Sequence, residues 1–228
     1  MIVPANQAEW PDLQGLLGSA NCHGRRCYCQ RFKSPGSDWK NASDEERAFR
    51  LRTQTSCGDP EAHDTSGLVA YRDGEAVGWV AVEPRTAFGA LRRSRVVWPG
   101  RAEDKDDAGV WAVTCFHTRP GHRNQGIAGE LARATVPFAR ERGATALEAY
   151  PMVTEPGEPV PWGEAHVGTR AMFEDAGFVE VGRPTPRRVV MRVELSGSPA
   201  GSPTGWRSPR GRRPRPGWRS GTARSPTV

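Results

Sequence analysis

The sequence predicts an α/β domain, with helices layered around a mixed sheet, and a disordered C-terminal tail. Segments of strand and helix periodicity alternate through residues 67–195. The chain of 228 residues is 36% hydrophobic, which suffices for one well-packed core. Residues 196–228 are nearly all Ser, Gly, Pro, Thr and Arg, too poor in apolar side chains to offset the entropy cost of ordering. We therefore place the domain in residues 1–195 and the tail in 196–228.

Two helices are predicted in the first third of the chain. The first should begin at Pro11 and end at Gly18, because the three leucines between them share one helical face and a first turn tolerates proline. The second should follow residues 43–46, Ser-Asp-Glu-Glu, a capping-box arrangement that precedes Phe49 and Leu51. A cysteine-rich loop separates the two helices.

Strand patterns fill the middle of the chain. The segments 68–71 and 76–82 flank Asp73-Gly74, a dipeptide that favours a hairpin turn because both residues accept a positive φ. Residues 109–117 form a third, strongly β-forming run. The predicted elements after it are a helix at 126–142, a strand at 146–150, a short helix at 169–176, and strands at 178–182 and 189–195.

The positive charge of the chain is concentrated in the tail. The formal net charge is +6, and residues 196–228 hold seven arginines and no acid, so the body carries −1. We therefore expect no nucleic-acid binding by the body; the tail either binds RNA through its arginines and tryptophans or has no defined role. No apolar run approaches the ~20 residues of a membrane span, and the N-terminus lacks the features of a secretory signal. These observations predict a cytoplasmic protein with no membrane partner.

Residues 123–128, Arg-Asn-Gln-Gly-Ile-Ala, stand where the long helix begins. The first turn of a helix carries unpaired N–H groups and a partial positive charge, so it attracts anions. Gly126 has no side chain to block a phosphate, Ala128 is small, and Arg123 adds a charge-assisted contact. The Walker pattern and the three-glycine dinucleotide fingerprint are both absent. The segment therefore predicts a pyrophosphate site outside those two motifs.

With its surroundings, this segment resembles the GCN5-related N-acetyltransferase (GNAT) family. The resemblance is carried by the strand 110–118, by Pro120, by residues 123–128, and by residues 171–178, a short helix that ends in Gly-Phe. It is best over 67–195, and earlier residues match only in their helical outline. It implies a twisted mixed sheet with helices on both faces, in which the strands 110–117 and 146–150 splay apart.

The resemblance also implies a reaction, the direct transfer of an acetyl group from acetyl-CoA, as co-substrate, to a primary amine of an unknown small molecule or protein. It implies no metal, and a homodimer is one option for the assembly. The pantetheine arm would pair with backbone groups of Phe116, His117 and Thr118, like an added strand. The residues expected to hold the pyrophosphate are Arg123, Asn124, Gln125, Gly126, Ile127 and Ala128.

Several residues are candidates for the acid and the base of this reaction. Many relatives have a tyrosine that protonates the leaving thiolate where this chain has Phe173, so Tyr150 or a water would substitute, or no acid is needed. An acyl-CoA-binding module without catalysis is therefore the alternative. His117 is a candidate base because an imidazole titrates near neutral pH, and Glu83, which ends a neighbouring strand, is another. Both side chains are otherwise interpreted as solvated or merely packed.

The cysteine-rich loop leaves three interpretations open, a zinc site, reduced cysteines beside the substrate, and redox or acyl chemistry. Its residues are Cys22, Cys27 and Cys29, with His23 adjacent and Cys57 and His63 farther along. This spacing is irregular for zinc, and the odd total of five cysteines argues against a disulfide framework. Cys115 is either a nucleophile or a small buried filler, and Trp39 and Trp162 either wall the acceptor pocket or fill the core.

Overall fold

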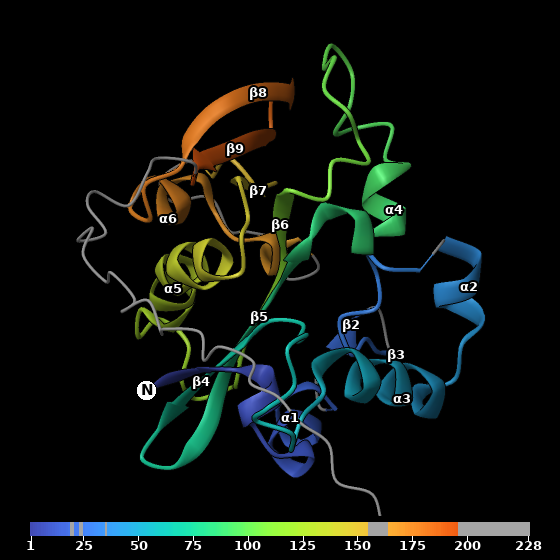
Figure 1. Ribbon diagram of the computed structural model, residues 1–228, viewed down its shortest axis with the longest axis vertical. Coiled ribbons are helices and arrows are strands. Elements are labelled where there is room, and N and C mark those ends of the chain that lie inside the picture. The colour runs from blue at the N-terminus through green and yellow to red at the C-terminus, as the bar shows by residue number, and fades with distance from the viewer. Residues whose placement is uncertain (19–20, 23–24, 35, 155–163, 196–228) are drawn as a thin grey trace, which may run out of the picture. The chain divides into compact units, whose positions relative to one another are not determined.

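The computed structural model describes residues 1–18, 21–22, 25–34, 36–154 and 164–195, which lie within the unit Met1–Gly197 (Figure 1). The segment 196–228, predicted to be a disordered tail, lies outside the described residues. The centre of the unit is a seven-stranded mixed sheet in the order β1-β4-β5-β6-β7-β9-β8. Its strands are β1 (Ile2–Pro4), β4 (Leu68–Arg72), β5 (Glu75–Pro84), β6 (Val110–Thr118), β7 (Ala146–Ala149), β8 (Val179–Thr185) and β9 (Arg188–Glu194).

Helices cover both faces of this sheet, as the fold class requires. The helices are α1 (Trp10–Leu17), α2 (Gly36–Asn41), α3 (Asp44–Thr55), α4 (Gly89–Arg92), α5 (Ile127–Glu141) and α6 (Arg170–Glu174), with 3-10 turns η1 (Ala5–Gln7), η2 (Arg85–Ala87) and η3 (Ala165–Val167). Ile127 and Leu131 of α5 pack on one face, beside α6, while Leu13 of α1 and Leu51 of α3 pack on the other. Within the described ranges, none of these helices combines the length and apolarity needed to cross a membrane.

The predicted elements form, and their boundaries have local causes. Ser43 caps α3 by accepting a hydrogen bond from the N–H of Glu46 at 3.1 Å. Asp73 and Gly74 adopt φ values of 52° and 80°, as a tight hairpin turn between β4 and β5 needs. The sequence analysis did not predict β1, which pairs with β4, nor α2, nor the small β2 (Asn21–Cys22) and β3 (Arg25–Arg26) pair. These elements are too short to show a periodicity.

The sheet opens between β6 and β7. These two strands pair in parallel from Val110 opposite Ala146 to Val113 opposite Ala149, and there the ladder ends. The strand β6 continues to Thr118, while the chain after β7 turns toward β9. From Thr114 onward, no strand of the described residues pairs with this edge of β6. The splayed strands that the GNAT resemblance implied are therefore present.

Candidate active site

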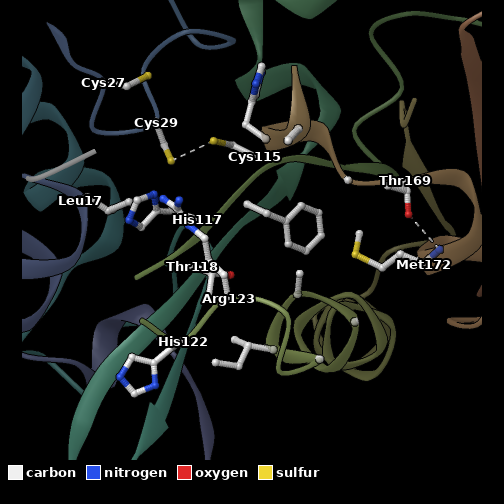
Figure 2. Close-up of a pocket in the computed structure, with 18 of the residues that line it drawn as sticks. Leu17, Cys27, Cys29, Cys115, His117, Thr118, His122, Arg123, Thr169 and Met172 are labelled. Carbon is white, nitrogen blue, oxygen red and sulfur yellow. Dashed lines mark hydrogen bonds between the residues drawn. The ribbon is translucent and has the colours of Figure 1, made fainter. Parts of the chain in front are cut away.

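A cavity of about 430 Å³ lies beside the unpaired edge of β6 (Figure 2). Its lining comes from five segments: the end of α1, the loop before α2, the end of β6, the turn before α5 with the start of that helix, and the stretch that includes η3 and the start of α6. Cys115 packs with the core on the α1 side of the sheet, whereas Phe116 and Ile127 belong to the core on the α5 side. Because all three line the cavity, the cavity passes through the gap in the sheet.

The turn before α5 presents unpaired backbone amides. Gly126 caps the helix with a φ of 78°, and the first helical hydrogen bond runs from the N–H of Glu130 to the carbonyl of Gly126 at 3.0 Å. Within the described part of the chain, the N–H groups of Ile127, Ala128 and Gly129 make no hydrogen bond. A Cβ built on Gly126 would meet nothing within 4 Å, so the space in front of these amides is open. The geometry suits an anion.

This turn is held in place by the β4–β5 hairpin. The Nε of Arg119 donates to the carbonyl of Ala76 at 3.0 Å, and its guanidinium pairs with Glu75 at 2.8 Å. Gly78 of β5 lets α5 approach closely, since a Cβ there would lie 2.6 Å from the Cγ2 atom of Ile127. Gln125 donates from its side chain to the carbonyl of Gly121 at 3.1 Å, which braces the turn from within.

Most of the residues expected to hold the cofactor do line this one cavity. They are Phe116, His117, Thr118, Arg123, Asn124, Gly126, Ile127 and Ala128. Gln125 does not line the cavity. The structure thus brings together the strand end and the helix start.

His117 lies within the cavity lining, and its Nε2 atom is buried without a hydrogen-bond partner in the described residues. Burial, with smaller contributions from the charges of Arg123 and Arg119, lowers the pKa of His117 from 6.5 to about 4. The imidazole is therefore neutral at pH 7. A neutral ring with a free nitrogen can exchange a hydrogen bond with a ligand, but so low a pKa makes it a weak base.

The other two candidate catalytic residues lie elsewhere. Glu83 pairs with Lys33 and accepts a hydrogen bond from the hydroxyl of Ser66; burial raises its pKa, and Lys33 opposes that effect. Tyr150 donates its hydroxyl to Glu148 at 2.8 Å, and burial raises its pKa. Neither residue lines the cavity, so the structure does not bring Glu83 or Tyr150 together with His117.

The cysteine-rich loop reaches the cavity. Cys27 and Cys29 line it, and the Sγ atoms of Cys29 and Cys115 are in contact (Figure 2). Cys57 and His63 do not line it, and His23 and the side chain of Cys22 lie outside what the structure describes. Among the residues that the structure describes, no group of three or more His, Cys, Asp or Glu is arranged to hold a metal ion.

The aromatic candidates divide in the same way. Trp39 is buried near the guanidinium of Arg47 and does not line the cavity, and Trp162 lies outside the described ranges. Phe173 is fully buried, and its ring packs edge-on against Phe116 and Phe178.

Part of the lining was not predicted from the sequence. Arg31 and Phe32 come from the loop before α2, and His166 comes from η3. These three residues show no motif, and only the fold places them beside β6. Met172 of α6 also lines the cavity, and it lies within the motif 171–178.

Comparisons with known proteins are consistent with this geometry. The model of the acetyltransferase (GNAT) family matches residues 31–178. The match begins well before residue 67, so it includes part of the loop that lines the cavity. A search of curated proteins finds no match to the chain.

Two solved structures share the fold. An N-acetyltransferase from Staphylococcus aureus Mu50 superposes with a TM-score of 0.50 at 13% identity, over 86% of this chain and 98% of that one. A structure described as an acetyltransferase gives a TM-score of 0.50 at 16% identity, over 86% and 100% of the two chains. A phosphinothricin acetyltransferase of the GNAT superfamily from Sinorhizobium meliloti, in complex with AcCoA, gives a TM-score of 0.48 at 19% identity. The match covers 90% of this chain and 92% of that one.

Proposed function

The chain belongs to the acetyltransferase (GNAT) family and is therefore an N-acetyltransferase, and we propose that its cavity binds acetyl-CoA together with a primary amine and passes the acetyl group directly between them. One observation carries the proposal. A single cavity is lined both by the open edge of β6 and by the amide-rich turn before α5. A strand edge that can pair with an extended chain, next to an anion cradle, suits a ligand that is a pantetheine arm ending in a diphosphate.

The residues present fit acetyl-CoA. The N–H groups of residues 124–128 would hold the pyrophosphate, with the open space at Gly126 admitting it and Arg123 adding positive charge. Backbone groups of Phe116, His117 and Thr118 would pair with the pantetheine arm, because this edge lacks a strand partner in the described residues. Once bound, acetyl-CoA supplies an acetyl group activated as a thioester.

The chain would then stabilise the charges of the transfer. The amine nitrogen forms a bond to the acetyl carbon, the carbon–sulfur bond breaks, the thiolate leaves with the electron pair, and the nitrogen releases a proton. A backbone N–H at the end of β6 would hold the oxyanion. His117, neutral and with a free Nε2, would accept a hydrogen bond from the amine, and the proton would pass to water because His117 is a weak base. Phe173 carries no hydroxyl, so the thiolate would leave unassisted.

Thermal unfolding with CoA, acetyl-CoA and NAD(P) tests the proposal, because a ligand that binds only the folded form raises Tm. We expect stabilisation by CoA and acetyl-CoA and none by NAD(P). Gly126→Glu places bulk and negative charge in the cradle. It should raise at least tenfold the concentration of acetyl-CoA that is needed for a given increase in Tm. Gly121→Glu is the matched control, since Gly121 also has a positive φ and open space but lies outside the cavity lining.

Thiol release from acetyl-CoA with a panel of primary amines tests catalysis itself. Release with at least one amine is expected. Stabilisation by acetyl-CoA without release for any amine would replace the enzyme by the acyl-CoA-binding module, and equal binding by Gly126→Glu would remove the proposed pyrophosphate site.

We also propose that the protein works in the cytoplasm. Cys29 and Cys57 carry free thiols, which suits a reducing compartment. A homodimer, and RNA binding by residues 196–228, stay predictions. Sedimentation of the full chain and RNA titration of a variant that lacks 196–228 would test them.

A further inference from the structure

Arg31 contributes an unpaired positive charge to the cavity. Its side chain lines the cavity, its Nη1 atom is buried without a hydrogen-bond partner, and no ion pair of Arg31 is found among the described residues. Arg31 as a whole is half-buried, but a buried N–H donor such as its Nη1 is normally paired, because leaving it unsatisfied is costly. An unpaired donor on a charged group that lines a cavity therefore indicates that its partner is a ligand with acceptor oxygens.

Within the part of the chain that the structure describes, the lining offers Arg31 no acid, since it contains no aspartate and no glutamate. Glu164, which follows the undescribed segment, is shared by Arg188 at 3.3 Å and Arg187 at 3.5 Å. Burial lowers the pKa of Arg188, and the charge of Glu164 partly offsets this effect. The positive charges of Arg187 and Arg31 lower the pKa of Arg188 further. This end of the cavity therefore has an excess of positive charge.

This positive end is distinct from the pyrophosphate cradle. Phe32, next to Arg31, packs against His166 with ring centroids 5.8 Å apart. Lys33 pairs with Glu83, which lies opposite Ala112 on β6, whereas Arg123 follows the other end of β6 at Thr118. From Ala112 to Thr118 a strand extends about 20 Å at ~3.3 Å per residue. Cys29 and Lys33, on either side of Arg31, contact Cys115 and Glu83, so Arg31 lies toward the Ala112 side of the site and Arg123 toward the Thr118 side. A diphosphate at the cradle would therefore leave Arg31 without a partner.

We propose that Arg31 binds the acidic group of the acceptor, so that the acceptor is a small amine that also carries a carboxylate, with an amino acid as the simplest case. A planar guanidinium matches a carboxylate with two parallel hydrogen bonds, which fixes the orientation of the acceptor as well as its affinity. The amine of such a molecule would extend from Arg31 toward the edge of β6. This inference rests on the proposed function, because it assigns the acceptor for the same reaction.

The test compares amino acids with their α-carboxamides, which keep the amine and lose the negative charge. For the wild type we expect kcat/KM for thiol release to be at least tenfold higher with the best amino acid than with its carboxamide. Arg31→Gln should lower kcat/KM for the amino acid at least tenfold, mainly by raising KM. It should leave kcat/KM for the carboxamide and the KM for acetyl-CoA unchanged. Arg31→Lys should restore part of the preference. Arg187→Gln is the matched control, because it removes the same charge nearby from a side chain outside the lining.

The outcomes separate the two claims. Equal use of amino acids and carboxamides by the wild type, or an unchanged preference in Arg31→Gln, overturns the role of Arg31 while acetyl transfer stands. If no amine is acetylated, the proposed function fails, and calorimetric titration of the same amino acids and carboxamides into the CoA-saturated protein decides the role of Arg31. Binding of an amino acid that Arg31→Gln abolishes supports that role; binding that Arg31→Gln leaves unchanged, or no binding, refutes it.

Discussion

The Sγ atoms of Cys29 and Cys115 lie 3.4 Å apart, although 86 positions separate the two residues in the chain (Figure 2). Cys29 adopts a left-handed φ of 55° and follows Tyr28 with a φ of 45°, so two non-glycine residues hold the loop in this position. Both thiols line the cavity. The contact joins the cysteine-rich loop to β6 beside the edge where the pantetheine arm is proposed to lie.

Mild oxidation should join these two thiols. With hydrogen peroxide as oxidant, two thiols and one peroxide give one disulfide and two waters. The bond would draw the loop onto β6, so we expect thiol release from acetyl-CoA to fall at least fivefold and to recover with dithiothreitol. Peptide mapping by mass spectrometry after alkylation should identify the Cys29–Cys115 linkage.

Two serine variants control this experiment. Cys115→Ser should retain activity in peroxide, whereas Cys57→Ser should behave as the wild type because Cys57 does not line the cavity. If peroxide lowers the activity of Cys115→Ser as much as that of the wild type, the Cys29–Cys115 pair is not the oxidation target.

His117 should make the protein less stable in mild acid. Its pKa is lowered from 6.5 to about 4, so below pH 6.5 the unfolded chain takes up a proton that the folded chain refuses until about pH 4. The free energy of unfolding should therefore fall as the pH drops through this window, by up to about 2 kcal/mol at pH 5. Urea unfolding at pH 7.5 and pH 5 should show a smaller loss for His117→Gln.

His63 provides the control for that measurement, because its side chain is 95% exposed. His63→Gln should keep the pH dependence of the wild type. An identical loss of stability in His117→Gln and the wild type would contradict the burial of an uncharged His117.

Gly78 should control the position of α5. In Gly78→Ala the new methyl group would lie 2.6 Å from Ile127 and 3.0 Å from Leu131, so α5 has to shift, at a cost of about 1–3 kcal/mol. Because α5 carries the proposed pyrophosphate cradle, stabilisation by acetyl-CoA should also decrease. Gly182→Ala is the matched control in a strand, since its Cβ would be 3.9 Å from the nearest atom; equal stability of the two variants would refute the close contact.

Glu148 should be essential for stability and not for binding. Its carboxylate is fully buried and receives three guanidiniums, those of Arg85 at 3.1 Å, Arg101 at 2.5 Å and Arg192 at 3.0 Å. Glu148→Gln removes the carboxylate that the three share and leaves the buried Arg85 without an ion pair among the described residues, which should lower the free energy of unfolding by about 3–5 kcal/mol in urea titrations.

The exposed Glu194, which pairs with the same Arg192 at 2.5 Å, is the control for Glu148. Its side chain is 66% exposed, so Glu194→Gln should cost less than about 1 kcal/mol. A Glu148→Gln protein as stable as Glu194→Gln would mean that the buried cluster contributes little.

Local patterns predicted most of the fold. The capping box at Ser43, the turn at Asp73 and Gly74, and the helix that follows Gly126 depend on residues within a few positions of one another. For the same reason, the sequence could indicate the turn of unpaired amides before α5, whose binding of a pyrophosphate stays a prediction. Tyr150 shows the limit of such reasoning. Periodicity placed it at the end of a strand, but it could not predict that the Tyr150 hydroxyl donates a hydrogen bond to Glu148.

By itself the sequence determined the family, the order of the longer strands and helices, and the amides that start α5, since each is encoded by neighbouring residues. Only the tertiary structure decided that Arg31 and Cys29 face the same cavity as His117. Nothing in the local sequence of the cysteine-rich loop encodes that position. It follows from the packing of α1 and α3 against the sheet, which carries the loop across to β6.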